Sequence, residues 1–176
     1  MHLMATLTTT ARLRSARGQA VIEMALTLPL LLLVILGIFD FGFMFQRYEV
    51  VTNAAREGAR LGVLPDYQSA AGELQAEQRA IAYLAASGIT GPPRGKPCGG
   101  NDPEQPGYVC VHLRKDGALG TATIPDPGGG PAKTVSQVTM VVEYDHEHAF
   151  VGPILSLFGG SMSTVRLRAV STMRRE

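Results

Sequence analysis

The 176-residue chain contains no tryptophan, has 6% aromatic and 18% charged residues, and carries a net charge of +1. A nearly neutral chain presents no electrostatic surface for nucleic acid. The scarcity of aromatic side chains also argues against a base-stacking platform. Because 45% of the residues are hydrophobic, a disordered charged tail is excluded as well. We therefore expect about one folded domain that binds no nucleic acid.

Motifs that carry chemistry are also scarce. Gly128-Gly129-Gly130 stands between prolines, which is typical of a linker rather than of a phosphate-binding loop. No Gly-x-Ser-x-Gly nucleophile motif occurs in the sequence. His146 and His148 would share one face of a strand and would offer two metal ligands beside Asp145 or Glu147. Two histidines without a third His or Cys in register are weak evidence, and a polar strand end entering a turn explains them better. We expect no enzymatic activity, no metal site and no cofactor.

Apolar residues concentrate between Met24 and Phe45, where Asp40 is the only charge. A membrane-spanning helix needs ~20 predominantly apolar residues, so this run predicts one span. A buried core helix would require a larger protein around it. A cleaved secretory signal peptide would have a shorter apolar run followed by small residues, where this chain has Gln46-Arg47-Tyr48-Glu49.

The orientation of the span follows from its flanks. Arg12, Arg14 and Arg17 precede it and no acidic residue occurs before Glu23, which favours a cytoplasmic N-terminus. Cys98 and Cys110 both follow it in a Gly- and Pro-rich stretch, which predicts a disulfide in an oxidising, extracytoplasmic compartment. Two unpaired thiols are the alternative. A zinc site is less expected, because the two cysteines with His112 match no zinc spacing.

The helix is expected to continue beyond the membrane through residues 46–63 and to end before Pro65. Within it, Ala54, Gly58 and Gly62 form a row of small residues that lets another backbone approach closely. Arg56, Glu57 and Arg60 beside this row fit a solvated face with a local ion pair. Pro29 predicts a bend, because it removes a backbone N–H.

A second helix over 69–86 with Gly88 as its stop, and alternating strands over 108–114, 135–144 and 165–173, complete the pattern. Asp116-Gly117 predicts a hairpin turn. In the last strand, Arg166 and Arg168 are expected to point outward. Residues 154–158 predict a short apolar helix or a loop on the core or the membrane surface.

The fold class is therefore α+β: one N-terminal transmembrane helix extended into a long helix, a second packing helix and a small antiparallel sheet. We expect residues 1–18 to form a cytoplasmic leader. Residues 19–64 then form the transmembrane and extended helix, and residues 65–176 form an extracytoplasmic α+β domain.

Glu23 opens the apolar run, where a carboxylate is costly unless it is paired or lies at the headgroup level. Gly18 stands five residues earlier, and a Gly followed by four residues and a Glu before a membrane helix is the pattern that type IV prepilin peptidases cut. Cutting after Gly18 would make Gln19 the new N-terminus. The amine of Gln19 would then be available to pair with Glu23 of a neighbouring subunit.

Four stretches resemble the TadE-like family, the pseudopilins of bacterial Tad (tight-adherence, Flp-type pilus) assembly systems. They are residues 17–23, 28–33 and 37–42 and, above all, the sequence Thr52-Asn53-Ala54-Ala55-Arg56-Glu57-Gly58-Ala59-Arg60. The resemblance covers residues 17–63, and residues 172–176 look like the family's usual ending.

The resemblance implies a minor pseudopilin or pilus assembly protein that crosses the bacterial inner membrane once and acts structurally after leader cleavage. It implies Gly18 and Gln19 as the processing site and Glu23 as the assembly carboxylate. The implied partners are the lipid bilayer, a prepilin peptidase, other pilin or pseudopilin subunits and the Tad assembly platform. Two functions remain as alternatives: an anchored extracytoplasmic binding module that enters no filament, and a membrane-tethered metallohydrolase that uses His146 and His148.

Overall fold

The computed structural model describes residues 4–67, 69–93, 98–99, 103–114, 122–125, 128–135, 137–157, 159–160 and 164–174. The predicted turn at Asp116-Gly117 lies outside these residues. The elements in chain order are α1 Met4–Gly62, η1 Pro65–Tyr67, α2 Ala70–Ala86, β1 Val109–Arg114, β2 Ala122–Ile124, β3 Lys133–Val135, β4 Gln137–Glu147, α3 Val151–Leu157 and β5 Thr164–Arg174. The α+β class is confirmed.

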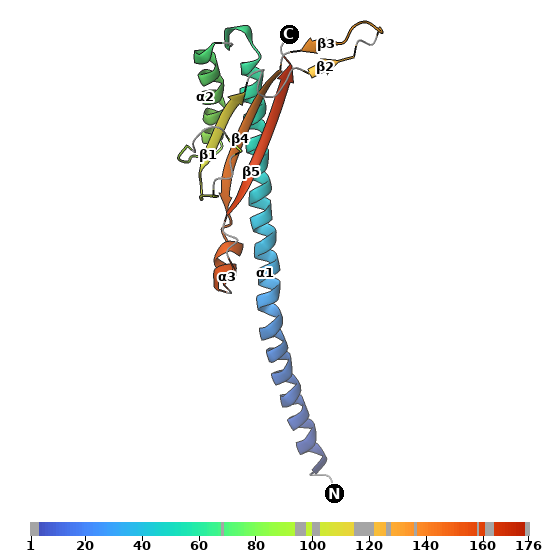
Figure 1. The fold of residues 1–176 in the computed structure, drawn as a ribbon. Coiled ribbons are helices and arrows are strands. Elements are labelled where there is room, and N and C mark those ends of the chain that lie inside the picture. Colours follow the sequence, from blue (N-terminus) through green and yellow to red (C-terminus); the bar gives the residue numbers. More distant parts are fainter. Residues whose placement is uncertain are drawn as a thin grey trace.

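Helix α1 is one unbroken helix of 59 residues, which at 1.5 Å per residue is about 90 Å long. Figure 1 shows the N-terminal part of α1 projecting away from the sheet and its C-terminal part running behind the sheet. We call α1 up to Phe45 the stem, and we call the rest of α1, together with α2 and the three-stranded sheet, the head. The prediction that the helix continues past the apolar run is therefore confirmed. Pro29 lies inside α1 without ending it, and the stem curves gently in Figure 1.

Helix α2 folds back onto α1. Ser69 caps its start, because its hydroxyl oxygen accepts a hydrogen bond from the backbone N–H of Gly72 at 3.1 Å. Gly88, with a φ of +75°, ends the helix as predicted. The row of small residues on α1 serves this packing: a Cβ added to Gly58 would lie 3.2 Å from the Cβ of Ala80 on α2.

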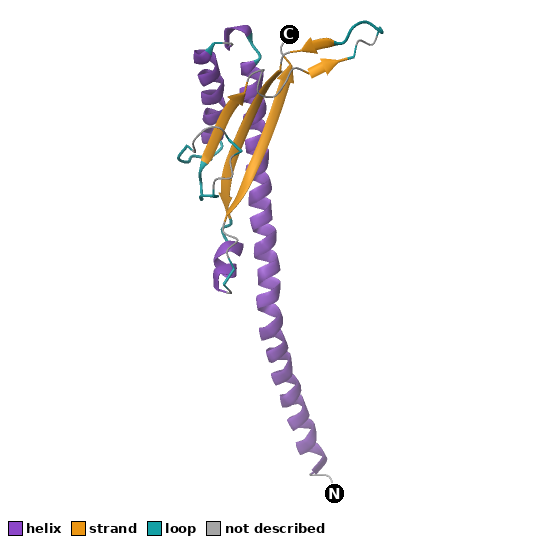
Figure 2. Ribbon diagram, viewed as in Figure 1, coloured by secondary structure: helices purple, strands orange, loops and turns teal. Residues whose placement is uncertain are grey.

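Strands β1, β4 and β5 form an antiparallel sheet in the order β1-β4-β5, and β2 pairs with β3 in a separate ribbon. Figure 2 shows the three-stranded sheet lying against α1 and α2. The core between them takes residues from both helices and from the alternate positions predicted on the strands: Val51, Ala54, Ala55, Ala59, Ala76, Ala80, Leu84, Val109, Val111, Leu113, Val138, Met140 and Val142.

The arginines of β5 lie on the outer face of the sheet, as expected, and each of them meets an acid of β4 there. Asp145 lies opposite Arg166 in the register, and Glu143 lies opposite Arg168. The Nε atoms of the two arginines lie 2.9 Å and 3.3 Å from the carboxylate oxygens of Asp145 and Glu143, and both carboxylates are buried. The outer face is therefore a ladder of cross-strand ion pairs, because the acids that β4 supplies at these positions need partners.

Candidate functional site

The stem is apolar and exposed. Its side chains from residue 18 to residue 35 are all exposed, and none of its apolar window is buried within the described fold. It is the one helix in the described part of the chain that is long and apolar enough to cross a membrane. A core helix would be covered by the rest of the chain, so the exposure of the stem excludes that alternative. The chain therefore fits a single-pass membrane protein.

The predicted processing and assembly residues lie near the start of the stem. Gly18, Gln19 and Glu23 are all exposed, and a Cβ added to Gly18 would meet no heavy atom within 4 Å. Because four residues make about one helical turn, Gln19 and Glu23 lie on the same side of α1. The side chains of Arg12, Arg14 and Arg17 lie outside the described part. The roles of Gly18, Gln19 and Glu23 stay predictions.

Gly18 lies inside α1 rather than in a loop. A peptidase that binds an extended backbone must therefore unwind the helix locally at this residue. Glycine lowers the cost of this unwinding, because it stabilises a helix interior by about 1 kcal/mol less than alanine does.

Asp40 joins the stem to the head, a role that sequence reasoning missed. It is 2% exposed although it stands in the apolar run. Its carboxylate accepts hydrogen bonds from the backbone N–H groups of Ala149, Phe150 and Val151, at donor–acceptor distances between 2.6 Å and 3.2 Å. These N–H groups stand at the start of α3, which would otherwise leave them unpaired. The signal in the sequence was the lone charge itself, but nothing nearby in the sequence points to residue 149.

Two histidines lie next to this junction. The ring centroids of His146 and His148 are 5.6 Å apart, edge to face. His148 Nδ1 lies 3.9 Å from Asp40 Oδ2. Burial lowers the pKa of His146 below its ordinary value, and the neighbouring His148 and Arg47 add to this shift. The histidines are therefore brought together as the sequence suggested.

The acid predicted to accompany the histidines lies elsewhere. Asp145 accepts hydrogen bonds from Arg166 Nε at 2.9 Å and from the Gln105 backbone N–H at 2.9 Å, and Glu147 is exposed. The acid that the fold brings to His148 is Asp40 of α1, 108 positions away in the chain. The histidine cluster thus lies where the end of β4 packs against α1.

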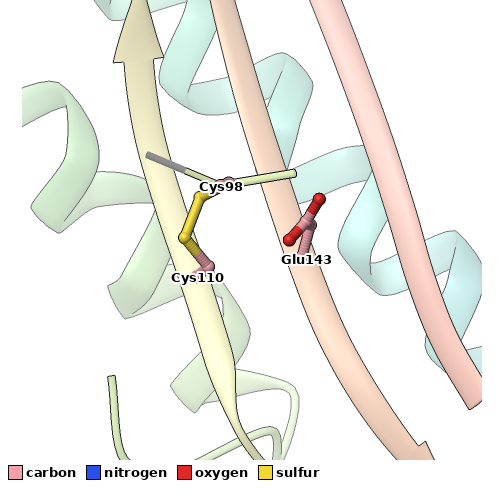
Figure 3. Close-up of side chains that lie close together, drawn as sticks. All are labelled: Cys98, Cys110 and Glu143. Atoms are coloured by element: carbon pink, nitrogen blue, oxygen red, sulfur yellow. A yellow bond between two sulfur atoms is a disulfide. The ribbon is translucent and has the colours of Figure 1, made fainter. Parts of the chain in front are cut away.

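The structure confirms the disulfide between Cys98 and Cys110. Figure 3 shows it beside the carboxylate of Glu143, which reaches it from the neighbouring strand β4. The two sulfurs and a Glu143 oxygen lie within 4.8 Å of one another. Both sulfurs are used by the S–S bond and Arg168 lies 3.3 Å from the carboxylate. The disulfide therefore ties the loop before β1 to β1 itself, beside Glu143 of the central strand β4. Closing a loop of this size contributes about 3 kcal/mol on the chain-entropy model.

The stretch that carries the strongest resemblance, residues 52–60, is where α1 enters the head. Ala54, Ala55, Gly58 and Ala59 are buried against α2 and the sheet. Glu57 accepts hydrogen bonds from Arg60 and from Arg79 of α2 on the outside. The Glu57–Arg60 pair fits the expected local ion pair, whereas the link to α2 was not foreseen.

Comparison with curated proteins and with solved structures finds no match to the chain. The model of the TadE-like protein family matches residues 18–60, which confirms the resemblance over most of the described length of α1. The match starts at the predicted processing residue and ends where α1 is packed into the head. Residues 18–60 are therefore a TadE-like segment, and this segment indicates a membrane protein associated with a Tad pilus system.

Proposed function

We propose that the protein is a minor pseudopilin or pilus assembly protein of a Tad system, and that it acts structurally after its leader is removed. The observation that carries the proposal is that the two halves of α1 have different surroundings. Its N-terminal half is an exposed apolar stem with Gly18 and Glu23 near its start, and its C-terminal half belongs to the core of the head. One rigid element thus connects the membrane to the folded head.

In this proposal the stem crosses the inner membrane once, with its N-terminus in the cytoplasm and the head outside. The disulfide supports this orientation, because such bonds persist in oxidising compartments. A prepilin peptidase cuts after Gly18. The trimmed stem then packs against the stems of other pilin or pseudopilin subunits on the Tad assembly platform, which would cover its exposed apolar side chains.

Glu23 sets the axial position of one stem relative to its neighbour during assembly. When stems pack together, its carboxylate leaves water and needs a positive partner. The new amine of Gln19 in a neighbouring subunit supplies one. Breaking a buried ion pair by removing one partner costs about 3–5 kcal/mol, so a subunit in the wrong axial position is disfavoured by that amount.

Cleavage is tested by replacing Gly18 in cells that hold the peptidase. Gly18→Val should leave an uncut precursor, heavier by roughly 2 kDa because the leader that marks a targeting segment stays attached. Gly42→Val is the matched control, since Gly42 also lies in the exposed stem with no heavy atom within 4 Å of an added Cβ. N-terminal sequencing and intact mass, with and without the peptidase, give the answer. A protein that starts at Gln19 in the Gly18→Val strain contradicts the proposed site.

Assembly is tested separately by Glu23→Gln, which keeps the size of the side chain and removes its charge. We expect normal membrane insertion and poor pilus output. Glu49→Gln is the control, because Glu49 is an exposed carboxylate of the same helix. If no shortened form is ever found beside an active peptidase, the anchored extracytoplasmic binding module becomes the better account.

A further inference from the structure

The segment between β4 and β5 has an unusual composition. Residues 149–164 contain no charged side chain. Helix α3 lies within this segment, and two large apolar side chains of the segment are exposed: Leu157, at the end of α3, is 82% exposed, and Phe150, just before α3, is 38% exposed. A connection on the water-facing surface of a head would ordinarily be polar. The composition and exposure of this segment therefore require an apolar environment.

The position of α3 tells which environment this is. Its first N–H groups are bound to Asp40, which stands five residues before the end of the apolar run at Phe45. Five residues of helix span about 7.5 Å. Figure 1 shows α3 beside the stem, beyond the end of the sheet and on the side of the N-terminus. If the apolar run fills the bilayer, α3 starts below the level at which the stem leaves it.

We propose that α3 and its flanking residues form a second membrane contact, an interfacial anchor that inserts into the extracytoplasmic leaflet. The partner is lipid at the boundary between headgroups and acyl chains. Helices of this kind bury their apolar face by about 5–10 Å, which matches the depth set by Asp40. The inference rests on the proposed function only in that α1 spans the membrane.

The hydrogen bonds at Asp40 support lipid over water as the surroundings. An ionised carboxylate inside a bilayer is costly unless it is paired. The first N–H groups of a helix are costly there as well, because no water can bind them. Asp40 and the start of α3 satisfy each other, with Asp40 only 2% exposed. In water, by contrast, solvent could also bind either group, so burial of both together is most needed in lipid.

The apolar surface is also continuous with the stem. Phe39 and Phe41 are 57% and 59% exposed on α1 next to Asp40, and α3 contacts this part of α1. Both surfaces must be covered by the same medium. The chain's charged residues resume only at Glu147 before the segment and at Arg166 after it, so the charged ends of β4 and β5 mark where water begins.

The absence of tryptophan from the chain allows a direct test with single-tryptophan variants of the full chain. Leu157→Trp probes α3, Phe41→Trp probes the stem, and Val170→Trp probes an exposed site on β5 far along the strand from α3. Each purified protein is reconstituted into phosphatidylcholine vesicles, with or without bromine atoms on the upper acyl chain. We expect bromolipid to quench Leu157→Trp and Phe41→Trp, with blue-shifted emission, and to leave Val170→Trp unquenched.

The three probes separate the possible failures. Quenching of Phe41→Trp with no quenching of Leu157→Trp overturns the anchor and leaves the proposed function standing. No quenching of either probe overturns the membrane span, and the proposed function with it. Adding Asp40→Asn to each background gives a further check. It should weaken the quenching of Leu157→Trp and leave that of Phe41→Trp unchanged, and equal effects on both contradict the role of Asp40 in holding α3.

Discussion

Replacing Asp40 by alanine should release α3 from the stem without unfolding the head. The carboxylate is the acceptor for the N–H groups of Ala149, Phe150 and Val151. The core of the head lies farther along α1, starting at Val51. The substitution also makes the apolar run more apolar, so membrane insertion should not suffer.

The magnitude follows from the contacts that are lost. A hydrogen bond to a charged group contributes about 1.5–3 kcal/mol, and loss of a capping side chain costs about 0.5–2 kcal/mol. The three bonds share one carboxylate, so their contributions do not add fully. We therefore expect local opening of α3 to become easier by about 2–4 kcal/mol, which corresponds to roughly 30- to 1,000-fold faster amide exchange.

Hydrogen–deuterium exchange with peptide mapping measures this change in the full chain. Peptides that cover residues 149–157 should lose protection in Asp40→Ala, while peptides from β4 residues 138–144 should keep it. Glu49→Ala is the control, because it removes an exposed carboxylate from the same helix. Unchanged exchange at 149–151 would refute the capping role of Asp40. Equal loss of protection in β4 would show instead that Asp40 supports the whole head.

Two further predictions concern the head. Gly58→Val should destabilise the head by about 1–3 kcal/mol through overpacking, because even a Cβ would lie 2.5 Å from Met140 Cε and 3.2 Å from the Cβ of Ala80. Thermal unfolding measures this change. A loss of stability no larger than that of Gly42→Val contradicts the prediction. The lowered pKa of His146 favours its neutral form in the folded state, so its contribution is present above its ordinary value of 6.5 and is lost as the pH falls below that value. His146→Gln should flatten the dependence of Tm on pH in that range, and an unaltered slope speaks against the assignment.

Local sequence patterns predicted the elements of this fold well. Helix α2 begins after Ser69, which carries a capping hydroxyl, and ends at Ala86, two residues before Gly88, which tolerates a positive φ. Strands β1, β4 and β5 were recognised from alternation, because each keeps one apolar face toward the helices, whereas the short ribbon of β2 and β3 was not predicted. The disulfide was predicted from two cysteines in one Gly- and Pro-rich stretch.

Long-range partnerships were the part that local patterns could not supply. Asp40 meets residues 149–151, Glu77 accepts a hydrogen bond from the Leu113 N–H at 3.0 Å, and Arg168 lies opposite Glu143. Each of these contacts depends on a strand register or on how two elements pack. Alternation placed the arginines of β5 correctly on the outer face of the sheet, but it could not identify the acids of β4 that lie beside them.

The last prediction concerns where the head begins as a folding unit. Val51, Ala54, Ala55 and Ala59 of α1 are at most 1% exposed and belong to the same core as α2 and the sheet. A fragment of residues 65–176 lacks these α1 side chains and would expose the apolar faces of α2, β4 and β5. We expect this fragment to remain unfolded or to aggregate. A fragment of residues 46–176 keeps these α1 side chains and omits the apolar run, and we expect it to fold. Circular dichroism and thermal unfolding of the two fragments, with the disulfide intact, distinguish these outcomes. Cooperative unfolding of the shorter fragment would show that the head folds without α1 and would contradict this prediction. If the shorter fragment does not fold while the longer one does, the stem and the core of the head are two ends of one structural element.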